Sequence, residues 1–114
     1  MADTLWYNGR CTKCRQALEL LKAREHDVRV REYLVERPTA AEVEILIRKL
    51  GNSAKDIVRT SEPEYATSGL TAHSSPQEIA RAIEKAPALL QRPILETPTR
   101  AIIGRPPERI TELL

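Results

Sequence analysis

The 114-residue sequence contains no phenylalanine, one tryptophan and three tyrosines, so its core has to be built mainly from aliphatic side chains. No apolar run approaches the roughly 18 residues of a membrane-spanning helix, and the N-terminal residues do not resemble a signal peptide. These absences predict a cytoplasmic protein that has no membrane partner.

The sequence also lacks a large excess of charge of either sign. The 18 basic and 16 acidic side chains leave a net charge of +2, and no basic run accompanies them. The charge therefore gives no argument for a nucleic-acid partner. With 41% hydrophobic and 30% charged residues the composition is that of an ordinary globular protein, and the length predicts one domain over residues 1–114.

Metal ligands are scarce. The sequence has two cysteines, Cys11 and Cys14, and two histidines, His26 and His73. A structural zinc site needs a second pair of ligands at a suitable spacing, which the sequence does not offer, so we expect no metal. In a reducing compartment a close pair of cysteines indicates redox chemistry rather than a structural disulfide.

The first thirty residues predict a strand, a helix and a second strand, the pattern of a right-handed βαβ unit. Residues 4–7 form a short apolar run, and residues 28–31 alternate valine with arginine. We expect Arg29 and Arg31 to lie on the solvated face of the second strand. Between the strands, apolar residues at i, i+3, i+4 and i+7 mark one helix face: Cys14, Ala17, Leu18 and Leu21.

A helical insertion is predicted over about residues 39–86. Residues 39–42 and 75–78 each place a threonine or serine three positions before a glutamate, which is the capping-box pattern at the start of a helix. Residues 53–59 predict a further short helix between these two. The insertion should therefore contain three helices.

The last third of the sequence predicts a hairpin and a helix. Residues 94–95 and 101–103 are apolar runs separated by turn residues. A final helix should follow, with Ile110, Leu113 and Leu114 toward the core. The element order βαβ–ααα–ββα predicts an α/β protein with a mixed sheet, in the form of a thioredoxin-like fold with a helical insertion.

The turn between the first strand and the first helix carries the reactive chemistry. Cys11 is predicted at the helix N-terminus, where unpaired backbone N–H groups and the helix dipole favour an anion and lower the pKa of a thiol. Arg10, Lys13 and Arg15 add positive charge. We predict a reactive Cys11 thiolate supported by Asn8, Lys13 and Arg15, in a turn that could also hold an oxyanion.

Cys14 has two interpretations. It lies on the apolar helix face, which is typical of a packed, non-catalytic cysteine. It also lies one helical turn from Cys11, so it could act as a resolving thiol and close an intramolecular disulfide if the geometry permits.

Four segments carry a family resemblance: residues 8–15 (NGRCTKCR), residues 57–59 (IVR) followed by Tyr65, residues 89–94 (LLQRPI) and residues 103–108 (IGRPPE). In this order and spacing, the sequence resembles the arsenate reductase family that couples to glutaredoxin, together with its short relatives. The resemblance covers essentially the whole chain.

The resemblance implies a site and a reaction. The cysteine at the position of Cys11 attacks the arsenic of arsenate, and glutathione and glutaredoxin then reduce the adduct and release arsenite. Arginines at the positions of Arg59, Arg92 and Arg105 hold the oxyanion, a role that suits the guanidinium fork. Pro93 matches the cis proline that thioredoxin-like folds keep beside the active cysteine.

The resemblance also implies the partners. These are arsenate or a similar oxyanion, glutathione as co-substrate, and glutaredoxin, with no tightly bound cofactor. We expect a monomer. The chain departs from the family pattern at Tyr7, which stands where the longer reductases carry a histidine, and at Cys14, where many relatives have serine.

Two other functions remain open. Spx-type regulators, which bind RNA polymerase and sense oxidation, share the fold, the CxxC motif and the Arg-Pro-Ile segment. This chain has both Arg59 and Arg105, which such regulators do not both keep, and this favours the enzyme over a regulator. The second alternative is a general thiol–disulfide reductase that uses the Cys11/Cys14 pair.

Overall fold

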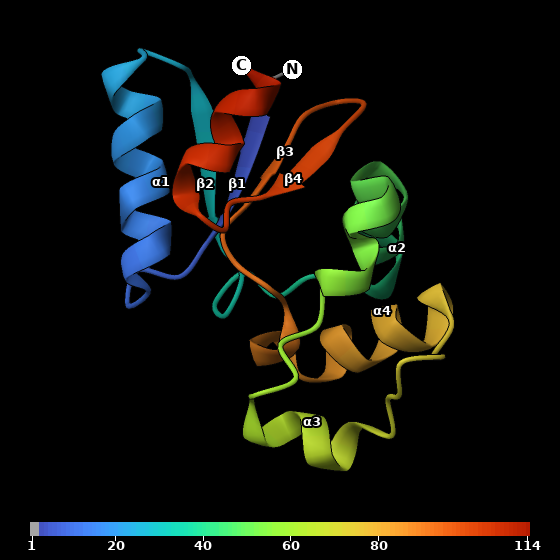
Figure 1. Cartoon of the computed structure of the whole chain (residues 1–114). Helices are drawn as coiled ribbons and strands as arrows, with labels where there is room; N and C mark the ends of the chain where they lie inside the picture. The colour runs from blue at the N-terminus through green and yellow to red at the C-terminus, as the bar shows by residue number, and fades with distance from the viewer. Residues whose placement is uncertain (1–2) are drawn as a thin grey trace.

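Strands from the two ends of the sequence form one four-stranded mixed sheet (Figure 1). Strand β1 (Asp3–Tyr7) lies parallel to β2 (Val28–Glu32) and antiparallel to β3 (Ile94–Glu96), which pairs antiparallel with β4 (Ala101–Ile103). The order across the sheet is β2-β1-β3-β4. The predicted βαβ opening and the predicted hairpin are both confirmed.

The computed structural model describes residues 3–114. Residues 1 and 2 of the predicted single domain lie outside the described residues. Within the described part of the chain, no helix has the length and apolar character needed to cross a membrane, and no group of three side chains could hold a metal ion.

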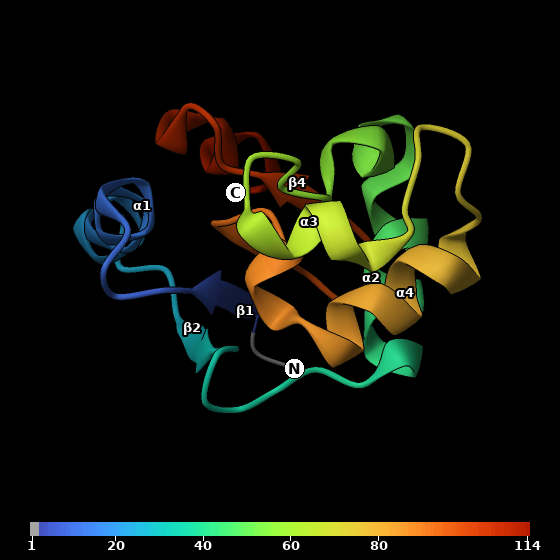
Figure 2. The ribbon, with the colours of Figure 1, turned by 90° about the horizontal axis from the view of Figure 1, so that it is seen from below.

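Helices cover both faces of the sheet (Figures 1 and 2). Helix α1 (Thr12–Ala23) and the 3₁₀ helix η3 (Pro107–Leu113) pack on one face, and α2 (Ala40–Leu50) packs on the other. Because successive side chains of a strand point to opposite faces, Leu5 packs toward α1 while Trp6 packs toward α2. Burial on both faces explains why two large apolar residues, Leu5 and Trp6, are adjacent in β1.

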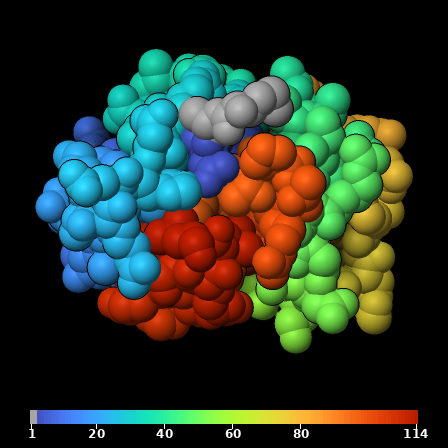
Figure 3. Space-filling view, turned by 90° about the horizontal axis from the view of Figure 1, so that it is seen from above, coloured from blue at the N-terminus to red at the C-terminus, as the bar shows by residue number. Residues whose placement is uncertain are grey.

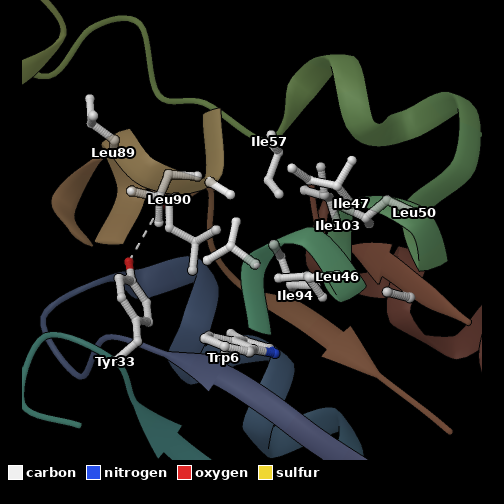
Figure 4. Packing of buried hydrophobic residues seen from close by; sticks show 14 residues of the cluster. Trp6, Tyr33, Leu46, Ile47, Leu50, Ile57, Leu89, Leu90, Ile94 and Ile103 are labelled. Carbon is white, nitrogen blue, oxygen red and sulfur yellow. Dashed lines mark hydrogen bonds between the residues drawn. The ribbon is translucent and has the colours of Figure 1, made fainter. Parts of the chain in front are cut away.

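The larger core lies on the α2 side of the sheet (Figure 4). It joins apolar side chains of the strands to those of the helical insertion, among them Trp6, Ile94, Ile103, Val43, Leu46, Ile57, Ile83 and Leu90. The aliphatic core predicted from the lack of phenylalanine is therefore confirmed.

The chain between β2 and β3 is mostly helical. Helix α2 continues into the 3₁₀ helix η1 (Gly51–Asp56), and α3 (Pro63–Ser68), α4 (Pro76–Lys85) and the 3₁₀ helix η2 (Pro87–Leu89) follow. Both predicted capping boxes are present, at the starts of α2 and α4. Each satisfies backbone donors that would otherwise be unpaired at a helix start.

The helix predicted over residues 53–59 is only half correct. Its first part is the helix η1, but its last three residues belong to no helix, because they pair with a distant segment. The Gln91 N–H donates to the Ile57 carbonyl at 2.7 Å, and the Arg59 N–H donates to the Leu89 carbonyl at 2.7 Å. These two bonds satisfy the backbone groups that a helix would have used.

The prediction that Arg29 and Arg31 share a solvated face is wrong for Arg31, which is only 6% exposed. Its guanidinium lies 4.6 Å from the centroid of the Trp6 ring and donates to both carboxylate oxygens of Glu42. Aromatic contact and a paired carboxylate make burial of this charge tolerable. Val30, on the other face of the edge strand, is 39% exposed.

The last helix differs from the expected one. It is a 3₁₀ helix, in which side chains three residues apart fall on one edge. Ile110 is fully buried and Leu113 is partly buried, whereas Leu114 is 41% exposed and does not face the core as predicted. Figure 3 shows this C-terminal segment in red, between α1 and the hairpin.

Candidate functional site

Three of the predicted site residues meet at one edge of the sheet. The register of the antiparallel pairs brings the end of β1, the start of β3 and the end of β4 side by side. Cys11 follows β1, Arg92 precedes β3 and Arg105 follows β4. Segments that are more than 80 residues apart in sequence therefore contribute to one site.

Cys11 occupies the N-cap position of α1. Its backbone is extended (φ −91°, ψ 120°), its N–H donates to the Asn8 carbonyl at 2.9 Å, and its own carbonyl accepts from the Arg15 N–H at 3.1 Å. This places the partly exposed side chain in front of the first helical turn. Backbone N–H groups in that turn lack helical partners.

Opposing effects act on the pKa of Cys11. Burial of the sulfur raises the pKa, but hydrogen bonds to the thiolate outweigh that effect, so the net pKa lies below its ordinary value. The donors are the backbone N–H and thiol of Cys14, the Arg92 guanidinium and the backbone N–H of Lys13. A lower pKa raises the fraction of thiolate, the reactive form, at neutral pH.

Cys14 lies in the opposite environment. It is fully buried, and it is not disulfide-bonded. Burial raises the pKa of its thiol to about 12, a rise that the backbone N–H of Asn8 partly offsets and that the neighbouring Cys11 increases. Cys14 therefore keeps its proton, and its S–H group donates a hydrogen bond to Cys11 from the buried face of α1.

Arg105 and Arg92 lie beside the Cys11 sulfur. The Nη2 of Arg105 is 3.9 Å from Cys11 Sγ, and its Nε donates to the Arg92 carbonyl at 2.8 Å. Arg92 has a side chain that is 16% exposed, and within residues 3–114 its buried Nε has no hydrogen-bond partner. A buried donor without a partner is uncommon and favours an anionic acceptor at this place.

Arg59 completes the set of arginines. Its Nε donates to Glu62 Oε1 at 3.0 Å, and its Nη1 donates to Gln91 Oε1 at 3.0 Å. A cleft of about 370 Å³ opens here, and its charged lining residues are Lys55, Arg59 and Arg105 with one carboxylate, Asp56. The remaining excess of positive charge suits a small anion.

The three residues predicted to support the thiolate act in different ways. Arg15 holds the turn, because its Nη1 donates to the Gly9 carbonyl at 2.7 Å and its Nη2 donates to Thr12 Oγ1 at 3.2 Å. Asn8 fixes the turn through backbone and side-chain oxygens that accept from later N–H groups. Lys13 contributes its backbone N–H, while its side chain is exposed.

Pro93 and Gly104 hold the two arginine-bearing segments together. The Arg92–Pro93 peptide bond is cis, as the family resemblance implies. The Gly104 N–H donates to the Pro93 carbonyl at 2.8 Å. A Cβ at Gly104 would lie 2.9 Å from Pro93 Cγ, so only glycine permits this approach.

Three residues of the site were not predicted from the sequence. Glu62 and Gln91 contact the arginines, and the buried Tyr33 donates its hydroxyl to the Leu90 carbonyl at 3.5 Å (Figure 4). Burial raises the pKa of Tyr33 to about 12, although the nearby Arg92 acts in the opposite direction. The sequence contains no local signal for Glu62, because a spacing of three residues favours an ion pair only on a helix, and residues 59–62 are not helical.

Comparisons with known proteins agree over nearly the whole chain. The model of the ArsC family matches residues 6–113. An arsenate reductase of Neisseria meningitidis is 37% identical, with 96% of each chain covered, and that of Haemophilus influenzae is 31% identical, with both chains fully covered. The uncharacterized protein YfgD of Escherichia coli is 36% identical, covering 96% of this chain and 94% of its own.

A solved structure agrees as well. The arsenate reductase from Vibrio cholerae is 31% identical and superimposes with a TM-score of 0.91, covering 100% of this chain and 98% of its own. The predicted thioredoxin-like α/β fold is therefore confirmed. From the family match and these relatives, the chain belongs to the ArsC family.

Proposed function

We propose that this protein reduces arsenate to arsenite with Cys11 as its nucleophile. The observation that carries the proposal is a thiol of lowered pKa that lies among arginines, with Arg105 Nη2 3.9 Å from the sulfur and Arg92 stabilising the thiolate. The relatives named arsenate reductase, at 31% and 37% identity over nearly full length, support the same reaction.

In the first step, Arg59 and Arg105, which line the cleft, and Arg92, which lies beside Cys11, hold the arsenate oxygens through their guanidinium forks. The Cys11 thiolate then attacks arsenic. A sulfur–arsenic bond forms, and one arsenate oxygen takes up protons and leaves as water. Arginine donors stabilise the negative charge that moves onto the remaining oxygens during the attack.

In the second step, a glutathione thiolate attacks the Cys11 sulfur. The sulfur–arsenic bond breaks, its electron pair stays on arsenic, and arsenite leaves. Cys11 and glutathione are then joined as a mixed disulfide, so two thiols have supplied the two electrons. Glutaredoxin removes the glutathione by thiol–disulfide exchange and regenerates Cys11.

Glutathione is a better second thiol than Cys14. The Cys14 side chain is fully buried, and its pKa is raised to about 12. A thiol attacks as its thiolate, so a buried thiol with this pKa is a slow nucleophile at neutral pH. This observation weighs against the dithiol reductase considered from the sequence.

The test is arsenate-dependent oxidation of NADPH in the presence of glutathione, glutaredoxin and glutathione reductase. We expect wild-type turnover, no turnover with Cys11→Ser, and turnover that requires both glutathione and glutaredoxin. Cys14→Ser is the matched control and should keep most of the activity. If the folded, reduced wild-type protein gives no turnover, arsenate is not its substrate under this coupling, and disulfide substrates would be tested next.

A further inference from the structure

Glu62 is an unexpected component of a site for an anion. Its Oε1 accepts from Arg59 Nε at 3.0 Å and lies 3.7 Å from Arg92 Nη1. The carboxylate is largely buried, with a side chain that is 22% exposed. Two of the three arginines that would hold the substrate therefore already share a negative charge.

This carboxylate opposes some anions more than others. A like charge next to a bound anion is repulsive, and the repulsion is stronger in a partly buried site than in water. A hydrogen bond removes the penalty only if the anion brings a proton. Among residues 3–114, the hydrogen bonds of Glu62 fall on Oε1, which leaves Oε2 free to accept one.

Tetrahedral oxyanions differ in this property. At neutral pH arsenate and phosphate retain at least one hydroxyl group, whereas sulfate has lost all of its protons. A hydroxyl group can donate to a carboxylate, but sulfate can only accept. A site that is built to pair with a substrate hydroxyl rejects an analogue that lacks it, because a polar group of the site is then left unpaired.

We propose that Glu62 is a specificity-determining residue that admits oxyanions carrying a hydroxyl group and rejects sulfate. In this role Oε1 holds Arg59 and Arg92 in place, and Oε2 accepts the hydroxyl proton of the bound oxyanion. The inference rests on the proposed function, because it assigns the substrate of the same site. It also makes a prediction about binding that needs no turnover.

The experiment measures protection of Cys11 against alkylation by iodoacetamide at pH 7 and constant ionic strength. Inorganic phosphate and sulfate are the probes, since neither can be reduced by the protein. For the wild type we expect phosphate to protect at a concentration at least roughly ten-fold lower than sulfate, as for a site that pairs with a hydroxyl.

Glu62→Gln is the diagnostic variant. Its amide oxygen still accepts from Arg59, but the negative charge is lost and the amide nitrogen can donate to sulfate. We expect protection by sulfate at a concentration lower by about ten-fold, with a smaller change for phosphate. Glu64→Gln, an exposed position two residues away on α3, is the matched control and should leave both concentrations unchanged.

A wild type without preference for phosphate, or a Glu62→Gln variant with an unchanged preference, overturns the inference. Circular dichroism reports whether each variant is folded. If Glu62→Gln is unfolded, Glu62→Asp replaces it, and the shorter side chain should weaken protection by phosphate while still excluding sulfate. Unchanged protection by both anions in that variant contradicts the proposal equally.

Arsenate turnover of the same preparations separates the two proposals. Turnover without anion preference overturns the role of Glu62 and leaves the reductase standing. Anion preference without turnover leaves the role of Glu62 standing and overturns the proposed arsenate reduction, because the oxyanion site is then present and the redox reaction is not.

Discussion

The molecule contains two clusters of paired charges that differ in their balance. In the sheet cluster, on the α2 side of the sheet, three cations pair with three carboxylates: Arg29, Arg31 and Lys49 with Glu36, Glu42 and Glu96. In the site cluster, among residues 3–114, Arg59 and Arg92 share the one carboxylate of Glu62. The third arginine, Arg105, donates to the Arg92 carbonyl and to Cys11 Sγ instead. Balanced charges satisfy one another, whereas a surplus of one sign attracts an ion from outside.

The partners of individual donors show the same difference. Arg31 of the sheet cluster stacks on Trp6, binds Glu42 and donates to two backbone carbonyls. Arg92 of the site cluster is also largely buried, but its Nε has no partner among the described residues. We infer that the sheet cluster stabilises the fold and that the site cluster serves the substrate.

The largest effect should come from removing Arg92. We expect Arg92→Ala to lower kcat/KM for arsenate by about 100-fold or more, because charge-assisted contacts to the transition state are lost. Arg31→Ala should lower it by less than about three-fold, since Arg31 does not contact the site. Steady-state kinetics with the coupled assay measure both values.

Equal losses of activity in these two variants would contradict the division into a structural and a functional cluster. Circular dichroism is the control for folding, so that a loss of activity is not counted when the protein has unfolded.

Arg31→Ala should have its effect on stability instead. The variant leaves Glu42 without its main partner and exposes the face of Trp6, and we expect the free energy of unfolding to fall by about 2 kcal/mol. Urea denaturation followed by tryptophan fluorescence or circular dichroism measures the change. A loss below 0.5 kcal/mol, about the effect of an ordinary surface substitution, would show that the sheet cluster is dispensable.

The third effect is on the chemistry of Cys11. Burial raises the pKa of Cys11 while the Arg92 guanidinium is among the groups that lower it, so Arg92→Ala should raise the pKa. The thiolate fraction at pH 7 then falls, and a rise of one unit slows alkylation by about ten-fold. The rate of alkylation against pH, with Cys14→Ser in the background, gives the pKa directly.

Arg31→Ala is the control for this profile as well. An unchanged profile in Arg92→Ala would mean that the backbone donors of the first helical turn stabilise the thiolate without help from the site cluster.

Most of the site cluster was predicted from the sequence, whereas the sheet cluster was not. Cys11 follows from its place at a helix start, and Arg92 and Arg105 were implied by the family resemblance. The burial of Arg31 was not predicted, because alternation along an edge strand shows two faces but not which of them the rest of the chain covers. The surroundings of Glu62 were hidden because α3 buries none of its residues and so lacks apolar periodicity.

The position of Arg59 shows a second limit. The segment Ile57 to Arg59 was predicted as helix from local pattern, whereas in the structure it leaves the helix and forms backbone bonds to Leu89 and Gln91. Those partners lie about thirty residues away, beyond the reach of a local pattern. The two capping boxes were predicted correctly, because the hydrogen bonds of a capping box form between residues only three positions apart.

The smallest effect concerns the stability of the fold in acid. It tests whether the carboxylate Glu42 of the sheet cluster contributes to stability through its pairing with Arg31. A hydrogen bond from Arg31 is the main reason that the pKa of Glu42 is lowered from 4.5 to about 2. A carboxyl with a lower pKa in the folded state stabilises the fold above its unfolded pKa and loses this contribution as the pH falls. The contribution of Glu42 should therefore be present above pH 4.5 and disappear toward pH 2.

Because the Glu42 side chain is 41% exposed, we expect this contribution to be below about 1 kcal/mol. Urea denaturation at pH 6 and at pH 3 measures it as the extra loss of stability of the wild type relative to Glu42→Gln. Other carboxylates titrate in both proteins, so only the difference between the two pH dependences counts. Identical dependences would mean that solvent already screens the Arg31–Glu42 pair, and that Arg31 stabilises the fold through its contact with Trp6.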